Sequence, residues 1–279
     1  MNILITLLTI CIVIFLYLHI VYQLKTSDDL EIYEIELPNK TRLEEVCELR
    51  QPIIFYYPIQ MNINDYTAFD INIKDNQTTV PLLFSKAIEL FNKDSDHKFY
   101  TEDNEMFLED TTLKKTYEIN DELLRPYMVA NKQYDFISGS INSIIPLRYN
   151  NYYRDYFVVI QGNITVKLTP PKNSKYLYKI VNYETEEYKS EINPWNPDEK
   201  HLSMYNKVKF LEIKVKQGQL IYIPSYWWFS IKLENQAQIC RFSYRTYMNY
   251  ISILPDIIRG ILQRNNIKIK SIPSITDKI

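Results

Sequence analysis

The hydrophobic and polar positions divide the chain into three parts. Residues 3–22 form an uninterrupted apolar run (ILITLLTICIVIFLYLHIVY). Short apolar clusters then alternate with charged stretches as far as residue 133, a pattern that favours surface helices and turns. From residue 134 to about 250, short strand-like runs are separated by turn residues, which is typical of a β-sandwich or barrel. The pattern predicts one apolar helix followed by a mainly β domain with peripheral helices.

The apolar run at residues 3–22 is long enough to cross a bilayer. Twenty residues at about 1.5 Å each span roughly 30 Å, the thickness of the hydrocarbon layer. A cleaved signal peptide is the alternative, but it requires a basic leader and a small-x-small cleavage site, and neither is present. We predict a retained single-pass anchor over residues 1–24 that contacts the lipid bilayer through residues 3–22. Too few basic residues flank the run to predict its orientation.

The remaining elements follow from periodicity and from helix-capping and turn residues. Residues 25–40 are acidic and predict a polar linker before a domain that spans residues 41–279. Thr41 with Glu44 three positions later fits a capping box and predicts a helix over 41–49. Further predicted elements are a strand at 53–57, helices at 81–92 and 250–265, and a barrel core at about 134–247 with strands at 134–138, 143–149, 156–160, 165–168, 210–215, 220–223, 227–233 and 238–244.

Composition excludes some classes of function. The formal net charge is −2 and charged residues make up 24% of the chain, so no basic excess indicates a nucleic-acid partner. Three cysteines are too few for a disulfide framework and fit no zinc spacing. The abundance of Asn, Ile, Lys and Tyr is typical of an AT-rich genome, such as that of a large DNA virus or a parasitic protist.

The most informative stretch is residues 218–231, GQLIYIPSYWWFSI. A glycine, an apolar run, a proline and a second apolar run predict two strands that meet at a corner. Since alternate residues of a strand face opposite sides, Trp227 and Trp228 should serve core and loop packing.

Two segments carry a family resemblance. Residues 143–171 (SIIPLRYNNYYRDYFVVIQGNITVKLTPP) and 218–231 resemble the two halves of the JmjC/cupin-like family, above all its asparaginyl-hydroxylase-like and Jumonji oxygenases. The IPSYWW segment is the most specific part. The resemblance extends over roughly residues 41–247. It implies a double-stranded β-helix, a jelly-roll barrel with helices packed outside it.

The resemblance also implies which residues should bind iron and 2-oxoglutarate. In the family, a His-x-Asp pair and a distal His hold Fe(II), and a lysine binds the co-substrate. Arg148, Asn150 and Phe229 stand at the three metal positions, and Ile164 stands at the lysine position. Arg is not deprotonated in proteins and Phe has no donor atom. We therefore predict no catalytic residue, no bound metal and no cofactor, and a pseudo-oxygenase that binds a partner or acts as a scaffold.

The histidine count supports this prediction without reference to a family. Outside the apolar run the chain has two histidines, His97 and His201, and both lie in charged, loop-like stretches. A two-histidine iron site would need this pair. The alternative is an active, divergent oxygenase of the protein hydroxylase or demethylase type that uses Fe(II) and 2-oxoglutarate.

The changed positions could still form a ligand pocket. Arg148 offers a five-donor fork that suits a carboxylate or phosphate, Asn150 offers a donor, and Phe229 offers an aromatic wall. Alternatively, Arg148 reaches solvent or pairs with a nearby acid such as Asp155. Trp195, on a turn-rich insert between the barrel halves, is a further candidate for ligand contact or for anchoring its loop. The expected partner is a small anion or an unidentified protein.

Overall fold

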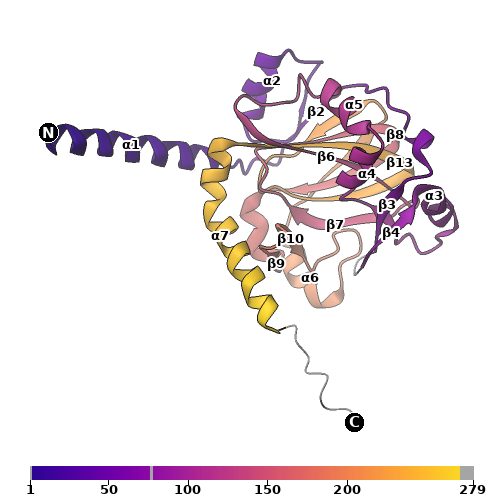
Figure 1. The fold of residues 1–279 in the computed structure, drawn as a ribbon. Helices are drawn as coiled ribbons and strands as arrows, with labels where there is room; N and C mark the ends of the chain where they lie inside the picture. The colour runs from indigo at the N-terminus through magenta and orange to yellow at the C-terminus, as the bar shows by residue number, and fades with distance from the viewer. Residues whose placement is uncertain (1, 76–77, 271–279) are drawn as a thin grey trace, which may run out of the picture.

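The computed structural model describes residues 2–75 and 78–270, so the end of the predicted domain at 271–279 lies outside the described residues. Helix α1 (Asn2–Gln23) projects from one side of the domain (Figure 1). Residues 3–18 of this helix are exposed around its whole circumference. Its segment Ile3–Gln23 is long and apolar enough to cross a membrane by length and composition, a test that signal sequences also pass.

The domain is built on a large sheet that is antiparallel except where β1 pairs with β2. Among the described residues its strands are β1 (Tyr33–Glu34), β2 (Ile53–Tyr56), β3 (Asp70–Lys74), β4 (Thr79–Leu83), β5 (Tyr100–Thr101), β6 (Val129–Gly139), β7 (Ile144–Tyr149), β8 (Arg154–Thr169), β9 (Lys179–Asn182), β10 (Glu187–Ser190), β11 (Leu211–Lys216), β12 (Gln219–Tyr222) and β13 (Trp228–Thr246).

Helices cover the sheet from outside and make the fold a mixed α/β one (Figure 1). The α-helices after α1 are α2 (Lys40–Cys47), α3 (Phe84–Lys93), α4 (Glu105–Asp110), α5 (Leu113–Asn120), α6 (Leu202–Tyr205) and α7 (Tyr247–Lys270). Short 3-10 turns occur at η1 (Ile63–Tyr66), η2 (Pro171–Tyr176) and η3 (Glu199–His201). The large antiparallel sheet confirms the β-rich part of the predicted fold.

Strands β8 and β13 form the centre of the sheet and pair with each other along their length. The sequence predicted two separate strands in each of these segments, and that division is wrong. Gly162 in β8 has φ +71°, and β13 has Asn235 and Gln236 at φ +50° and +53°. These left-handed residues bend the strands where the ladder shifts register between Glu234 and Gln238, so each strand continues past the bend.

The bent strands enclose an apolar interior. The first half of β13 pairs with β7 and its second half with β6. The two halves of β8 likewise pair with β12 and β11. Side chains from all these strands meet in one buried cluster that includes Trp227, Phe229 and Ile164. Trp228 lies in a different cluster, which confirms that the two tryptophans face opposite sides.

The segments before the central strands differ in detail from the prediction. Helix α2 is capped by Asn39, whose side-chain oxygen accepts the Arg42 backbone N–H at 2.8 Å. The predicted capping box on Thr41 is therefore wrong, because Asn39, a stronger cap residue, precedes it. Residues 25–40 contribute β1, so this polar segment is docked on the sheet. The helix predicted at 81–92 begins only at Phe84, because the residues before it complete β4.

Candidate functional site

Arg148 and Phe229 are neighbours across two paired strands. Arg148 lies near the end of β7, Phe229 lies near the start of β13, and their Cα positions are register partners. The Arg148 guanidinium carbon lies 5.5 Å from the centroid of the Phe229 ring. Asn150 follows directly after β7. The fold thus brings together the three positions at which the resemblance implies metal ligands.

Arg148 is not free to act as a ligand-binding fork. It donates two hydrogen bonds to the carboxylate of Glu102, one of them 2.8 Å from Nη1 to Oε2. The Glu102 side chain is 1% exposed and follows β5. Lys74 Nζ and Arg241 Nη1 each lie 3.7 Å from a Glu102 oxygen. One buried carboxylate is therefore shared by three cations.

Asp155 is the second buried carboxylate of this network. Arg241 donates two hydrogen bonds to it, each 2.9 Å long. The Asn150 amide donates to Asp155 Oδ2 at 2.6 Å, and the Ser243 hydroxyl donates to Oδ1 at 2.7 Å. Arg148 does pair with an acid, as one alternative had it, but the acid is Glu102 rather than Asp155, whose two oxygens accept hydrogen bonds from Arg241. Sequence reasoning missed Glu102 and Arg241, because nothing in their local sequence marks them as partners.

The network shifts the protonation of its members. Burial raises the pKa of Glu102, but the charge and hydrogen bonds of Arg148, with Lys74 and Arg241 behind them, outweigh it and lower the pKa to about 2. For Arg148, burial lowers the pKa, but the Glu102 carboxylate outweighs it, so its pKa is raised. Both groups are therefore charged at neutral pH, and the ion pair is a permanent feature of the native state.

Asp135 lies beside this network and titrates in the opposite direction. Burial, followed by the charges of Glu102 and Asp103, raises the pKa of Asp135 to about 7. Its side chain accepts the backbone N–H groups of Asp103, Asn104 and Phe136 at 2.8–2.9 Å. One oxygen of each of Glu102, Asp103 and Asp135 lies within 4.8 Å of the others. These oxygens already have protein partners, since Lys74 pairs with both Glu102 and Asp103.

A cavity of about 510 Å³ opens beside the network. We call it the polar cleft. Its lining carries both signs of charge, with cations from Lys74, Arg148 and Arg241 and carboxylates from Glu184 and Glu186. Asn150 also lines it, whereas Phe229 and Trp195 do not. The polar cleft can therefore hold a polar group by hydrogen bonds, but it is not a purely cationic site for an anion.

Ile164 is part of the apolar interior. It is fully buried, and its register partners are Leu233 on β13 and Val215 on β11. Nearer the network, the rings of Phe157 and Phe229 pack edge to face with centroids 5.5 Å apart. The position at which the resemblance implies a co-substrate lysine thus lies in a buried apolar cluster of the described residues.

Trp195 lies apart from these residues. Its indole N–H donates to the Ser230 hydroxyl at 2.9 Å, and the ammonium groups of Lys167 and Lys232 lie 4.5 Å and 5.8 Å from its ring. These contacts anchor the loop that carries Trp195 to the outside of β8 and β13. The predicted pocket of Arg148, Asn150, Phe229 and Trp195 is therefore not one site, because the loop docks elsewhere.

The two histidines of the domain differ in their surroundings. His97 is exposed and has φ +57°. His201 is 5% exposed, its ring is tilted by 47° against that of Tyr178 with centroids 4.7 Å apart, and its Nε2 lies 3.6 Å from a Glu191 oxygen. His201 was expected in a loop-like stretch, but it ends the 3-10 turn η3 and its ring is buried beside Tyr178.

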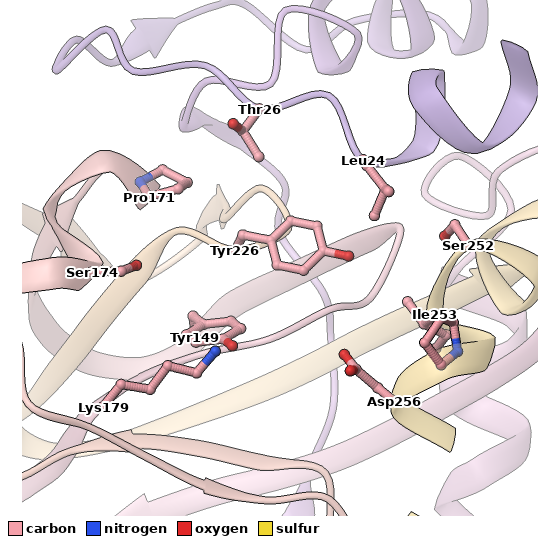
Figure 2. Close-up of a pocket in the computed structure, with 11 residues that line it drawn as sticks. Leu24, Thr26, Tyr149, Pro171, Ser174, Lys179, Tyr226, Ser252, Ile253 and Asp256 are labelled. Atoms are coloured by element: carbon pink, nitrogen blue, oxygen red, sulfur yellow. The ribbon is translucent and has the colours of Figure 1, made fainter. Parts of the chain in front are cut away.

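A second cavity, of about 460 Å³, lies where the segment after α1 meets α7. Figure 2 shows the rings of Tyr149 and Tyr226 at its centre, with Lys179 and Asp256 on one side. Lys179 Nζ lies 4.8 Å from the centroid of the Tyr149 ring. Burial lowers the pKa of Lys179, although the nearby Asp256 carboxylate opposes the shift. Leu24 closes the opposite side, so this cavity links the root of α1 to α7.

The residues present do not fit an Fe(II) centre at the positions that the resemblance implies. A facial triad needs two imidazoles and a carboxylate. Here the donor set is a guanidinium held by Glu102, an amide held by Asp155, and a phenyl ring. A positive guanidinium repels a cation, so the arrangement cannot hold the metal without rebuilding all three positions.

Comparison with known proteins identifies the family. The cupin-like domain family matches residues 60–250. HSPB1-associated protein 1 of Rattus norvegicus and of Homo sapiens is 27% identical over 95 residues, which is 34% of this chain and 20% of each relative. JmjC domain-containing protein D of Dictyostelium discoideum is 26% identical over 99 residues, 36% of this chain and 22% of that protein. The matched region thus spans about a fifth of each curated relative. The family match covers more than half of this chain. The chain therefore belongs to the cupin-like domain family.

Proposed function

We propose that this chain is a membrane-anchored cupin-like protein that has lost oxygenase chemistry and acts by binding a partner. The observation that carries the proposal is the ion pair between Arg148 and Glu102 above the Phe229 ring. A charged, hydrogen-bonded pair occupies the place where an oxygenase of this kind needs open metal positions. The apolar surroundings of Ile164 among the described residues add support, because hydrocarbon side chains do not bind the carboxylate of a co-substrate.

We infer that the sheet is a double-stranded β-helix, the finer fold that the resemblance implies. The pairing of β8 and β13 supports this inference, because each strand bends and contributes its two halves to different sets of neighbours. β7 and the start of β13 lie side by side, and the polar cleft is lined by Arg148 near the end of β7 and by Arg241 from the second half of β13.

The competing function is a divergent Fe(II)- and 2-oxoglutarate-dependent oxygenase. Anaerobic titration of the purified full-length chain with Fe(II), followed by exposure to 2-oxoglutarate and O₂, separates the two. We expect no stoichiometric iron and no succinate. One Fe(II) per chain with succinate formation would contradict the proposal. A variant with His97→Ala and His201→Ala is the control, since any iron that this variant also binds is not held by a histidine of the domain.

The anchor is a separate part of the proposal. Helix α1 exposes apolar side chains on all sides, which is favourable in lipid and costly in water. The chain should remain in the membrane fraction after alkaline carbonate extraction, with residues 1–24 still attached by intact mass. A soluble product that lacks the helix would show instead that the run is a cleaved signal sequence. A Leu8→Arg, Ile12→Arg variant is the matched control and should be extracted.

The partner is a small anion or a protein segment that enters the polar cleft. Lys74 and Arg241 supply donors there, and Glu184 and Glu186 supply acceptors. A panel of organic acids, inorganic phosphate and peptides can be screened by thermal shift with wild type and with a Glu186→Gln variant. A probe that stabilises the two proteins equally does not bind in the cleft. If no anion stabilises the wild type, the anion half of this proposal fails.

A further inference from the structure

Helix α7 has its apolar face on the outside. Among residues 247–265, whose side chains the structure describes, six large apolar side chains, each 39–61% exposed, recur at intervals of three and four residues: Tyr247, Ile251, Leu254, Ile258, Ile261 and Leu262. At 100° per residue these positions fall within about 100° of the helix circumference. We call this surface the α7 stripe. A helix that packs on a soluble domain normally buries such a stripe.

The domain-facing side of α7 buries Ile253 but is otherwise mainly polar. The Asn249 amide donates to the Asn151 carbonyl at 3.2 Å. The Gln263 amide group accepts the Tyr183 backbone N–H at 3.0 Å and donates to the Asn182 side chain at 2.9 Å. Gly260 is buried against the Tyr183 carbonyl, where a Cβ would lie only 2.5 Å from the oxygen. Polar contacts and a close backbone approach therefore fix the orientation of α7, and the stripe is held outward.

The position of α7 relative to α1 indicates which surroundings cover the α7 stripe. Figure 1 shows α7 running transverse to α1, on the side of the domain from which α1 projects. The two helices are in contact, and the last turns of α1 share a cavity of about 410 Å³ with Tyr247 and Met248 at the start of α7. If a bilayer surrounds α1, its surface lies at the level of α7, because the last turns of α1 contact α7. Since α7 runs transverse to α1, all of α7 lies close to that surface.

Neighbouring residues continue the apolar surface around the root of α1. Tyr127 and Met128, in the loop before β6, are 65% and 72% exposed and line the same cavity as Tyr22 and Tyr247. Tyrosine rings favour the boundary between headgroups and hydrocarbon. The apolar surface of the anchor is thus continuous with the α7 stripe through a set of interfacial aromatic residues.

We propose that α7 is an interfacial helix that lies on the bilayer surface with its stripe among the lipid headgroups and upper acyl chains. This proposal rests on the membrane anchor proposed above. The contact orients the domain, since α1 fixes one point and α7 fixes a line in the membrane plane. It thereby sets how the polar cleft is presented to a partner.

Spin-label depth measurements on the full-length chain test the proposal in vesicles of phosphatidylcholine and phosphatidylserine. A nitroxide on the native Cys11, which is exposed in the middle of α1, reports the anchor. In a Cys11→Ser background, nitroxides at Ile258→Cys and Ile261→Cys report the stripe. Cys47 and Cys240 are fully buried and should not react. Ile119→Cys on α5, at a site 77% exposed, is the control for a side chain in water.

The expected result is a several-fold higher ratio of oxygen to nickel-chelate accessibility at positions 258 and 261 than at 119, with the highest ratio at 11. If the label at position 11 is in lipid while the accessibility ratios at positions 258 and 261 equal the ratio at position 119, the α7 proposal is overturned and the anchor proposal stands. If the label at 11 is also in water, both fail. Strong dipolar broadening between singly labelled chains at 258 would overturn the lipid contact in favour of a second copy of the chain.

Discussion

The guanidinium of Arg148 donates two hydrogen bonds to the buried carboxylate of Glu102, although 46 positions separate the two residues. The pair lies over the Phe229 ring, between β7 and the loop after β5. Lys74 and Arg241 also pair with the Glu102 carboxylate. This relationship explains both how the domain tolerates buried charge here and why a cation should not bind at these positions.

Loss of one partner should destabilise the domain strongly. Glu102→Ala leaves the buried Arg148 cation without its carboxylate partner, and such losses cost about 3–5 kcal/mol. We expect a reduction of that size in the free energy of unfolding from urea denaturation. The matched control is Glu89→Ala, which removes a pair whose side chains are 79% and 70% exposed and should change stability by less than about 1 kcal/mol. Equal effects of the two variants would contradict the buried network.

The pH dependence of stability should carry the signature of Asp135. Its pKa is raised from 3.8 to about 7 in the folded chain, so between these values the folded state holds a proton that the unfolded state has released. The contribution of this proton to the free energy of unfolding should therefore be fully present below about pH 4 and should be lost as the pH rises through about 7. Asp135→Asn cannot titrate, and the slope of unfolding free energy between pH 4 and 7 should become less negative. An unchanged slope would show that Asp135 is ionised in the native state.

The bend of β8 should depend on Gly162. A Cβ there would lie 2.7 Å from the Asn235 carbonyl oxygen, and φ is +71°. Gly162→Ala should therefore cost about 1–3 kcal/mol of unfolding free energy. Gly218 also has a positive φ, but the atom nearest to its added Cβ belongs to the Tyr56 side chain, which can rotate away. Gly218→Ala should cost less, and the reverse order would contradict this account of the bend.

Restoring the family ligands should create a metal site. In the variant Arg148→His, Asn150→Asp, Phe229→His, the register of β7 and β13 brings the two imidazoles together. The new carboxylate would lie close to Asp155, and a divalent cation would relieve their repulsion. We expect stoichiometric Co(II) binding with visible d–d absorption in the variant and none in wild type. Circular dichroism shows whether the variant is folded. If a folded variant binds no Co(II), these residues do not occupy the family metal positions.

The sequence by itself determined the local elements and the family. The apolar run of α1, the strands around the IPSYWW corner and the C-terminal helix follow from periodicity and turn residues, which act over a few neighbouring positions. The assignment of Arg148, Asn150 and Phe229 to the family metal positions rests on the sequence resemblance alone. The continuity of β8 and β13 did not follow from the sequence, since left-handed residues bend a strand in the same places where they could end it.

Only the tertiary structure decided how these pieces interact. The fold pairs Arg148 with Glu102 and Arg241 with Asp155. Charge pairing in a buried site depends on distances across strands rather than on spacing in the chain. The fold separated Trp195 from the other predicted pocket residues by docking its loop on Ser230. It also turned the apolar side of α7 outward, because Gly260 and Gln263 fix the opposite side to the domain. Periodicity reveals that a helix has an apolar face, and packing decides where that face points.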